Sequence, residues 1–143
     1  EAVRTRTQQT GFTLVEALIA LLVLSVGLLG VAAMQLKALQ SAHAGYQRAV
    51  ASLAAQDVVE LLWEELDMNS GSCPTSSTVN LADWTERWGN FLPSLNGSPV
   101  TAEPSSNSDD CVYEIQIRWQ EERFEGEGVP IFEYTARLPK GGS

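Results

Sequence analysis

The sequence predicts an α+β fold in which one long N-terminal helix is followed by a small antiparallel sheet. The run 17–36 contains no charged residue and no proline, and residues 36–66 are rich in strong helix formers. Residues 111–119 and 132–138 alternate between apolar and polar side chains, as strands with one buried face do. The chain has 143 residues, the size of a single domain, which excludes a large multidomain enzyme.

The uncharged run from Ala17 to Leu36 has the length of a membrane-spanning helix, about 30 Å. Arg4 and Arg6 precede it, which favours a cytoplasmic N-terminus and places the bulk of the chain outside. A cleaved secretory signal peptide is the alternative, but its apolar region is shorter, about 7 to 15 residues, and residues 32–34 match its cleavage site only weakly. We therefore expect the segment to be retained.

The helix is expected to continue out of the membrane, from Thr13 to about Asp67, because no proline occurs before Pro74. An apolar stripe along its second half predicts a face that packs in a domain core. The stripe consists of Leu39, Tyr46, Val50, Leu53, Ala54, Val58, Leu61 and Leu62. The one histidine, His43, has no acid or thiol near it in sequence, so we interpret it as a solvated helix residue.

The remaining sequence predicts a short helix and two paired strands. Residues 69–78 form a polar loop that ends the long helix, and Asn80 and Pro93 bracket an amphipathic helix with core-facing aromatic residues. The apolar residues of this helix are Leu81, Trp84, Trp88, Phe91 and Leu92. Residues 95–110 read as a surface connection. The two alternating runs, with residues 125–128 between them, predict a β-hairpin or meander, and residues 140–143 a frayed tail.

The cysteines and the charged residues narrow the classes of function. Cys73 and Cys111 are predicted to form a disulfide in an exported domain, with two unpaired core thiols as the alternative. The net charge is −9 and no basic cluster is present, so direct nucleic-acid binding is not expected.

Two carboxylate pairs, Asp109–Asp110 and Glu121–Glu122, lie in predicted loops or turns. Loop carboxylates can bind calcium, but no EF-hand spacing is present, and we interpret these pairs as solvated surface charge. Neither a metal nor a cofactor is predicted.

Glu16 is a carboxylate at the edge of the apolar run. An acidic residue costs about 2.5 to 3.5 kcal/mol at the centre of a membrane and less near its surface, so we expect a cationic partner from another chain or terminus. The alternative is a solvated carboxylate at headgroup level, whose charge is favoured by the helix N-terminus.

The segment around Glu16 reads Gly11-Phe12-Thr13-Leu14-Val15-Glu16-Ala17-Leu18-Ile19-Ala20. It closely resembles the processing site of type IV prepilins and type II secretion pseudopilins. The resemblance implies that prepilin peptidase removes a leader, residues 1–11, after Gly11 and methylates the amine of Phe12. It also implies that Glu16 pairs with the N-terminal amine of a neighbouring subunit or guides entry into the filament. The chain would then be an enzyme's substrate and not an enzyme.

The likeness extends through residues 24–30 to Leu36, where the chain is similar to PilV-type minor pilins and to I-type minor pseudopilins. Gly27 and Gly30 are small residues that could let helices pack closely. The resemblance implies the type IV pilin-like fold, whose long helix packs through its second half on an antiparallel sheet. It divides the chain into the leader, a transmembrane segment at 12–36 and a periplasmic or extracellular head at 37–143.

The resemblance implies a noncatalytic minor pilin that primes assembly of a type IV pilus, in a minor-pilin complex at the tip, and supports twitching motility and adhesion. The implied partners are other minor pilins, the major pilin, the inner-membrane assembly platform and prepilin peptidase. The chain would be a single-pass inner-membrane protein before assembly and part of a surface pilus afterwards. A minor pseudopilin of type II secretion is the alternative. A membrane-anchored periplasmic enzyme or binding domain is disfavoured, because no nucleophile and base form a set.

Overall fold

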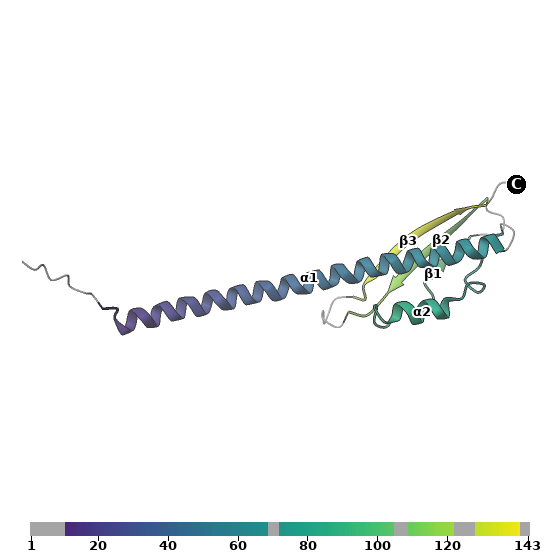
Figure 1. The fold of residues 1–143 in the computed structure, drawn as a ribbon. Coiled ribbons are helices and arrows are strands. Elements are labelled where there is room, and N and C mark those ends of the chain that lie inside the picture. Colours follow the sequence, from purple (N-terminus) through teal and green to yellow (C-terminus); the bar gives the residue numbers. More distant parts are fainter. Residues whose placement is uncertain (1–10, 69–71, 105–108, 122–127, 141–143) are drawn as a thin grey trace, which may run out of the picture. The chain divides into compact units, whose positions relative to one another are not determined.

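The computed structural model describes residues 11–68, 72–104, 109–121 and 128–140. They form, in chain order, α1 (Leu14–Met68), α2 (Leu81–Gly89), β1 (Val100–Ala102), β2 (Asp110–Arg118) and β3 (Ile131–Pro139), as Figure 1 shows. The strands make one antiparallel sheet in the order β1-β2-β3. The predicted α+β fold, a long apolar N-terminal helix with a small antiparallel sheet, is therefore confirmed and is consistent with a pilin-like fold.

Several predicted features lie outside the described residues. They are residues 1–10 of the leader, 69–71 of the polar loop, 125–127 of the turn, Glu122, and 141–143 of the tail.

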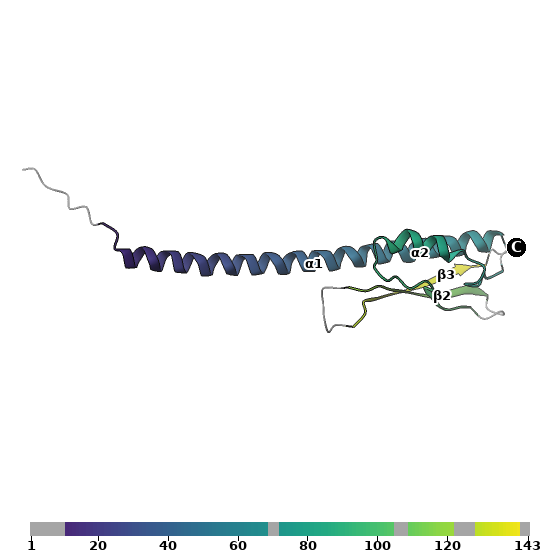
Figure 2. The same ribbon diagram turned by 90° about the horizontal axis from the view of Figure 1, so that it is seen from below.

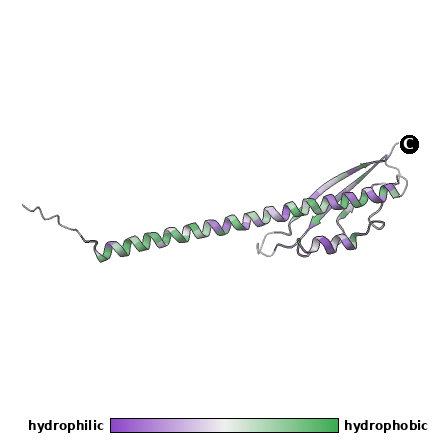
Figure 3. Cartoon of the chain, in the orientation of Figure 1, coloured by the Kyte–Doolittle hydropathy of each residue, from purple (hydrophilic) through white to green (hydrophobic). Residues whose placement is uncertain are grey.

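The chain forms two compact units, Glu1–Ser41 and Ala42–Ser143. In the first unit α1 is exposed on all sides from Leu14 to Leu39, and Figure 3 shows the apolar character of its N-terminal part in green. Among the described residues α1 is the one helix long and apolar enough to cross a membrane, with a window of mean hydropathy 2.6 that is 0% buried. A helix that is apolar on every side needs apolar surroundings from outside the chain.

In the second unit the C-terminal part of α1 lies beside α2, and both helices lie along the sheet, as Figures 1 and 2 show together. The buried residues of α1 recur at intervals of three and four, so they share one face of the helix. They are Gln47, Val50, Ala51, Ala54, Ala55, Val58, Leu62 and Leu66. The rest of the core comes mainly from Trp84 of α2 and from the inward residues of the sheet.

The predicted apolar stripe on α1 is only partly correct. Val50, Ala54, Val58 and Leu62 are buried and Leu61 is partly buried, whereas Leu39, Tyr46 and Leu53 are 66%, 53% and 54% exposed. Successive residues turn by about 100° around a helix, which puts Tyr46 and Leu53 on the side away from the buried face. The predicted stripe therefore combined residues from two different faces of the helix.

The alternation predicted for the central strand is confirmed. Cys111, Tyr113, Ile115 and Ile117 of β2 are buried, as is Trp119 just beyond the strand. β2 pairs with β3 along its whole length, from Asp110 opposite Pro139 to Arg118 opposite Ile131.

The segment 95–110 contains a strand and is not only the surface connection predicted from its composition. β1 pairs with β2, and the residues before β1 continue along the same edge through single hydrogen bonds. Gln116 N donates to Pro99 O at 2.7 Å, and the Asn96 side chain accepts from Arg118 N and donates to Gln116 O, both at 2.8 Å. A polar side chain thus takes the place of a ladder bond, which a hydrophobic pattern cannot reveal.

Two aromatic residues predicted to be buried are exposed. Phe91 is 50% exposed because α2 ends at Gly89, so the helical spacing no longer applies to it. Tyr134 is 41% exposed, and β3, which carries it, is an edge strand with a neighbour on one side only. Trp84 is buried as predicted, and Trp88 is partly buried.

Candidate processing and assembly site

The motif-bearing residues lie where α1 begins. Gly11, Phe12 and Thr13 precede the first helical residue, Leu14, and the Phe12 side chain is 86% exposed. The Thr13 hydroxyl oxygen accepts a hydrogen bond from the backbone N–H of Glu16 at 3.3 Å, and the Thr13 carbonyl accepts from Ala17 N at 3.1 Å. Thr13 therefore caps the helix and leaves the Gly11–Phe12 bond outside it.

This capping role of Thr13 was not predicted, although the sequence carries a signal for it. A Thr followed three residues later by a Glu is the capping-box pattern, and Thr13 and Glu16 have this spacing. Glu16 lies in the first turn of α1, where the helix dipole favours a negative charge. The ion pairs found within the described part of the chain do not include Glu16, so its cationic partner on another chain stays a prediction.

Gly27 and Gly30 lie within α1, in the exposed first unit. Apart from the neighbouring residues and the helix's own backbone, no atom would lie within 4 Å of a Cβ built at either position. The space beside both residues is open, as close approach of another helix would require. This chain's own packing gives no reason for glycine there.

A covalent bond and two hydrogen bonds tie the segment after α1 to the sheet. Cys73 and Cys111 form the disulfide that the sequence suggested, across a separation of 38 residues. The Tyr113 hydroxyl donates to Pro74 O, and Ser76 N donates to the Glu103 carboxylate, both at 2.6 Å. This segment is therefore fixed to the central strand.

These contacts shift two pKa values. Hydrogen bonds from Ser76 lower the pKa of the Glu103 carboxyl from its usual value. Burial, and secondarily the charge of Glu103, raises the pKa of Tyr113 to about 12. The charged form of Glu103 and the neutral form of Tyr113 are thus the forms that the fold favours.

Three indole groups hold α1 to the rest of the second unit. Trp84 Nε1 donates to Ala54 O at 3.0 Å, Trp88 Nε1 to the Asp57 carboxylate at 2.7 Å, and Trp119 Nε1 to Gln47 Oε1 at 3.1 Å. Gln47 is 5% exposed, and its buried amide oxygen is satisfied by this bond. The indoles fix the position of the helix in addition to filling the core.

The other sequence candidates form no catalytic arrangement. His43 is partly buried beside the ring of Tyr46, with ring centroids 6.5 Å apart. Asp109 is exposed, and Asp110 is not simply solvated but forms an ion pair with Arg137. One oxygen of Glu121 is buried without a hydrogen-bond partner. No group of three or more possible metal ligands occurs within the residues that the structure describes.

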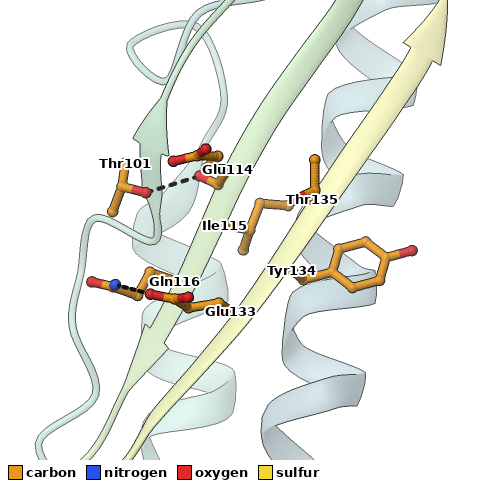
Figure 4. A pocket seen from close by; sticks show the side chains of 7 residues that line it. All are labelled: Thr101, Glu114, Ile115, Gln116, Glu133, Tyr134 and Thr135. Atoms are coloured by element: carbon orange, nitrogen blue, oxygen red, sulfur yellow. Dashed lines mark hydrogen bonds between the residues drawn. The ribbon is translucent and has the colours of Figure 1, made fainter.

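A small pocket of about 140 Å³ lies on the sheet, and Figure 4 shows its lining. Thr101 Oγ1 donates to Glu114 O at 3.2 Å, and Gln116 Nε2 donates to Glu133 Oε1 at 2.9 Å. Tyr134 points away from the Gln116–Glu133 pair (Figure 4). These are cross-strand contacts that stabilise a sheet, and they place no nucleophile beside a base.

Residues 6–32 match the family model described as the prokaryotic N-terminal methylation motif. No curated protein and no solved structure matches the chain. The match supports the pilin family and a type IV pilin or pseudopilin subunit, and it indicates a substrate of prepilin peptidase. Together with the exposed apolar helix, it points to a membrane-anchored pilin-like protein whose partners belong to pilus or related assembly.

Proposed function

We propose that the chain is a PilV-type minor pilin that primes assembly of a type IV pilus from a minor-pilin complex at the tip, and so supports twitching motility and adhesion. The observation that carries this proposal is the methylation motif at the start of a helix that has no charge between residues 17 and 36 and is exposed throughout residues 14–39. A structural subunit needs such a surface, because its helix must pack against other helices in a membrane and then in a filament.

The residues at the start of α1 supply the proposed steps. Prepilin peptidase removes the leader, residues 1–11, by cutting the bond after Gly11 and then methylates the new amine of Phe12. Thr13 keeps this bond outside the helix and therefore accessible to a protease. Glu16 pairs with the N-terminal amine of a neighbouring subunit and sets the register between helices.

These steps also assign roles to the membrane segment and to the head. The transmembrane segment, residues 12–36, packs laterally, with close approach at Gly27 and Gly30, and the head, residues 37–143, stays periplasmic until assembly. The partners are other minor pilins, the major pilin and the inner-membrane assembly platform. The Cys73–Cys111 disulfide suits an oxidising compartment.

The processing step is tested by mass spectrometry of the mature chain from wild-type cells. We expect an N-terminal Phe12 that carries a methyl group, and its absence from a strain without the peptidase. A mature chain with residues 1–11 intact would contradict the processing step and both pilin functions.

The choice between a pilus and a secretion pseudopilus needs one paired measurement on a deletion strain. Surface pili and secreted exoproteins are counted in the same culture. Lost pili with normal secretion are expected. Normal pili with exoproteins trapped in the periplasm would replace the minor pilin by the alternative, a minor pseudopilin of type II secretion.

The role of Glu16 is tested by Glu16→Ala, which should abolish incorporation into pili while the head remains folded. The matched control is Glu60→Ala, an exposed glutamate on the same helix in the second unit, which should leave incorporation unchanged. Normal incorporation of the Glu16 variant would remove its register role.

A further inference from the structure

We propose that Asn96–Gly97 is a modification site, at which the chain deamidates itself when an edge of the sheet opens, and that the product keeps this edge open. The edge in question is the β1 edge, residues 96–102, which lies along β2. Asn96 is the asparagine of this sequence that a glycine follows. Glycine has no side chain to hinder attack by its own backbone nitrogen on the asparagine before it. Cyclisation at this dipeptide is therefore the least hindered in the chain.

The reaction takes water as its one co-reactant. The backbone nitrogen of Gly97 attacks Cγ of Asn96, the bond between Cγ and Nδ2 breaks, and Nδ2 leaves as ammonia together with the proton of the Gly97 amide. A five-membered cyclic imide is formed. Water then opens the imide at one of its two carbonyl carbons, which gives aspartate or isoaspartate at position 96. No group is oxidised or reduced in these steps.

The folded chain holds the Asn96 side chain away from this reaction. Its Nδ2 donates to Gln116 O at 2.8 Å and to Ser98 O at 3.2 Å, and its Oδ1 accepts from Arg118 N at 2.8 Å. Both amide donors and the amide oxygen are thus in use. Formation of the imide requires the side chain to rotate onto the Gly97 nitrogen, and the bonds to β2 oppose that rotation. The fold therefore protects Asn96 while the β1 edge is closed.

The same bonds make Asn96 the main connection between its segment and β2. The N–H and C=O groups of Gln116 and Arg118 bond to this segment. Gln116 N donates to Pro99 O, and the remaining groups bond to Asn96, whose backbone N donates to Arg118 O at 3.1 Å. β1 itself has 3 residues, and its register with β2 is irregular. A short and irregular edge opens at a lower free energy than the core of a domain, so Asn96 is released before the chain unfolds.

The product of the reaction does not restore these bonds. Aspartate at position 96 has no amide hydrogens, so the carbonyl oxygens of Gln116 and Ser98 would face a negatively charged oxygen instead of a donor. Isoaspartate adds a methylene group to the main chain and moves the bonded groups out of register. The change is covalent, so the β1 edge stays open and β2 presents unpaired backbone groups there. Asn96–Gly97 is therefore a one-way switch that records an opening of the sheet.

The first test measures deamidation of the purified full chain in detergent, by mass spectrometry of the peptides that contain position 96. The rate is compared in the native chain, in urea below the unfolding midpoint, and in the fully unfolded chain. Gly97→Ala is the matched control, because its methyl group hinders the attack. Apart from its chain neighbours, a Cβ at Gly97 would meet Thr85 Oγ1 at 3.8 Å, an ordinary contact that the fold accepts.

We expect aspartate and isoaspartate at position 96 to form at least about ten times faster in the unfolded chain than in the native chain, with an intermediate rate at low urea. Gly97→Ala should slow the reaction in the unfolded chain about ten-fold. Equal rates in the native and the unfolded chain would overturn the protection by the bonds of Asn96. An unfolded chain that stays unmodified at position 96 would overturn the site itself.

The second test asks whether the product opens the edge, by hydrogen exchange of Asn96→Asp in the full chain. Asn90→Asp is the control, because it adds the same charge while its side chain bonds to Glu86 O and not to β2. We expect the amide hydrogens of Gln116 and Arg118 to exchange about ten times faster in the Asn96 variant than in the control. Equal exchange would overturn the switch. If the Asn96 variant fails to fold, ion exchange separates the modified from the unmodified form of the aged native chain, and the same comparison is made on these two forms.

Discussion

The two parts of α1 are one continuous helix, but they are stabilised by different things. Residues 14–39 are all exposed and are held within the chain by the helix's own hydrogen bonds. Residues 42–68 bury eight side chains and receive three indole hydrogen bonds. The first part therefore depends on apolar surroundings supplied by a membrane or by other chains, whereas the second depends on the chain's own core.

The largest expected effect falls on the second part alone. Replacing both Cys73 and Cys111 by serine should lower the free energy of unfolding by about 4 kcal/mol, because the disulfide closes a long loop in the unfolded chain. Urea unfolding of the full chain in detergent measures this loss. Membrane extraction of the same variant should be unchanged, and release from the membrane would show that the two parts are not independent.

Two leucine substitutions, one in each part of α1, are expected to affect different properties, either stability or membrane anchoring. Leu62 is 0% exposed, so Leu62→Ala should cost about 3 kcal/mol of unfolding free energy and leave membrane anchoring intact. Leu28 is 62% exposed, so Leu28→Arg should leave the unfolding midpoint unchanged. It should weaken insertion by about 3 kcal/mol. Membrane fractionation and urea unfolding are measured for both variants. If the two variants changed anchoring and unfolding in the same way, the two parts of α1 would not be stabilised separately.

The indole hydrogen bonds are tested with the tryptophans themselves. Trp119→Phe leaves the buried Gln47 oxygen without a donor and should cost about 2 kcal/mol, measured by circular dichroism during urea unfolding. Trp63→Phe is the control, since Trp63 is 40% exposed and should change stability by less than about 0.5 kcal/mol. Equal effects would mean that packing volume, not the hydrogen bond, matters.

The pKa of Tyr113 predicts how the stability of the second part depends on pH. Burial raises this pKa from 10.0 to about 12, so the native state keeps the proton over a range in which the unfolded state loses it. The contribution of Tyr113 is fully present below its unfolded pKa and is lost as the pH rises through its folded pKa. Urea unfolding at several pH values across that range should show the decline, and Tyr113→Phe should flatten it. A decline of equal slope in the variant would assign it to other groups.

The smallest expected effect concerns one strained residue. Ser94 has a φ of 53°, a conformation that glycine adopts without cost. Ser94→Gly should raise the free energy of unfolding by about 0.5 kcal/mol, the net of relieved strain and a more flexible unfolded chain. Ser94→Ala keeps the strain and removes only the hydroxyl. Its stability should therefore fall below that of the glycine variant in parallel urea titrations.

The sequence predicted the elements whose pattern arises from a single physical cause. Polarity predicted the uncharged run, and turn composition predicted the end of α1 near Asp67 and the cap at Asn80. A period of two residues predicted the alternation in β2. The predictions failed where tertiary contacts decide. The residues before β1 join β2 through the side chain of Asn96, and Tyr134 is exposed on β3, which is an edge strand. Leu53 was predicted to be buried because it is large and apolar, but it lies on the side of α1 away from the buried face.

The candidate site was predictable at the level of its motif, and less so in its geometry. Gly11, Phe12 and Glu16 were identified from their order in the chain. The part played by Thr13 is local as well, and the capping-box spacing would have indicated it. The sequence predicts a cationic partner for Glu16 on another chain without identifying it, and that partner stays a prediction.

The position of the disulfide has a mechanical consequence. Cys73 follows the end of α1 closely, and Cys111 lies in the central strand, so tension applied between the helix and β2 passes through the sulfur–sulfur bond. The chain between the two cysteines, a sequence separation of 38 with a contour length of about 130 Å, is removed from the load path and cannot be drawn out while the bond is intact. α2 and β1 lie between the two cysteines. A force that pulls the helix away from β2 would therefore not stretch them while the disulfide is intact.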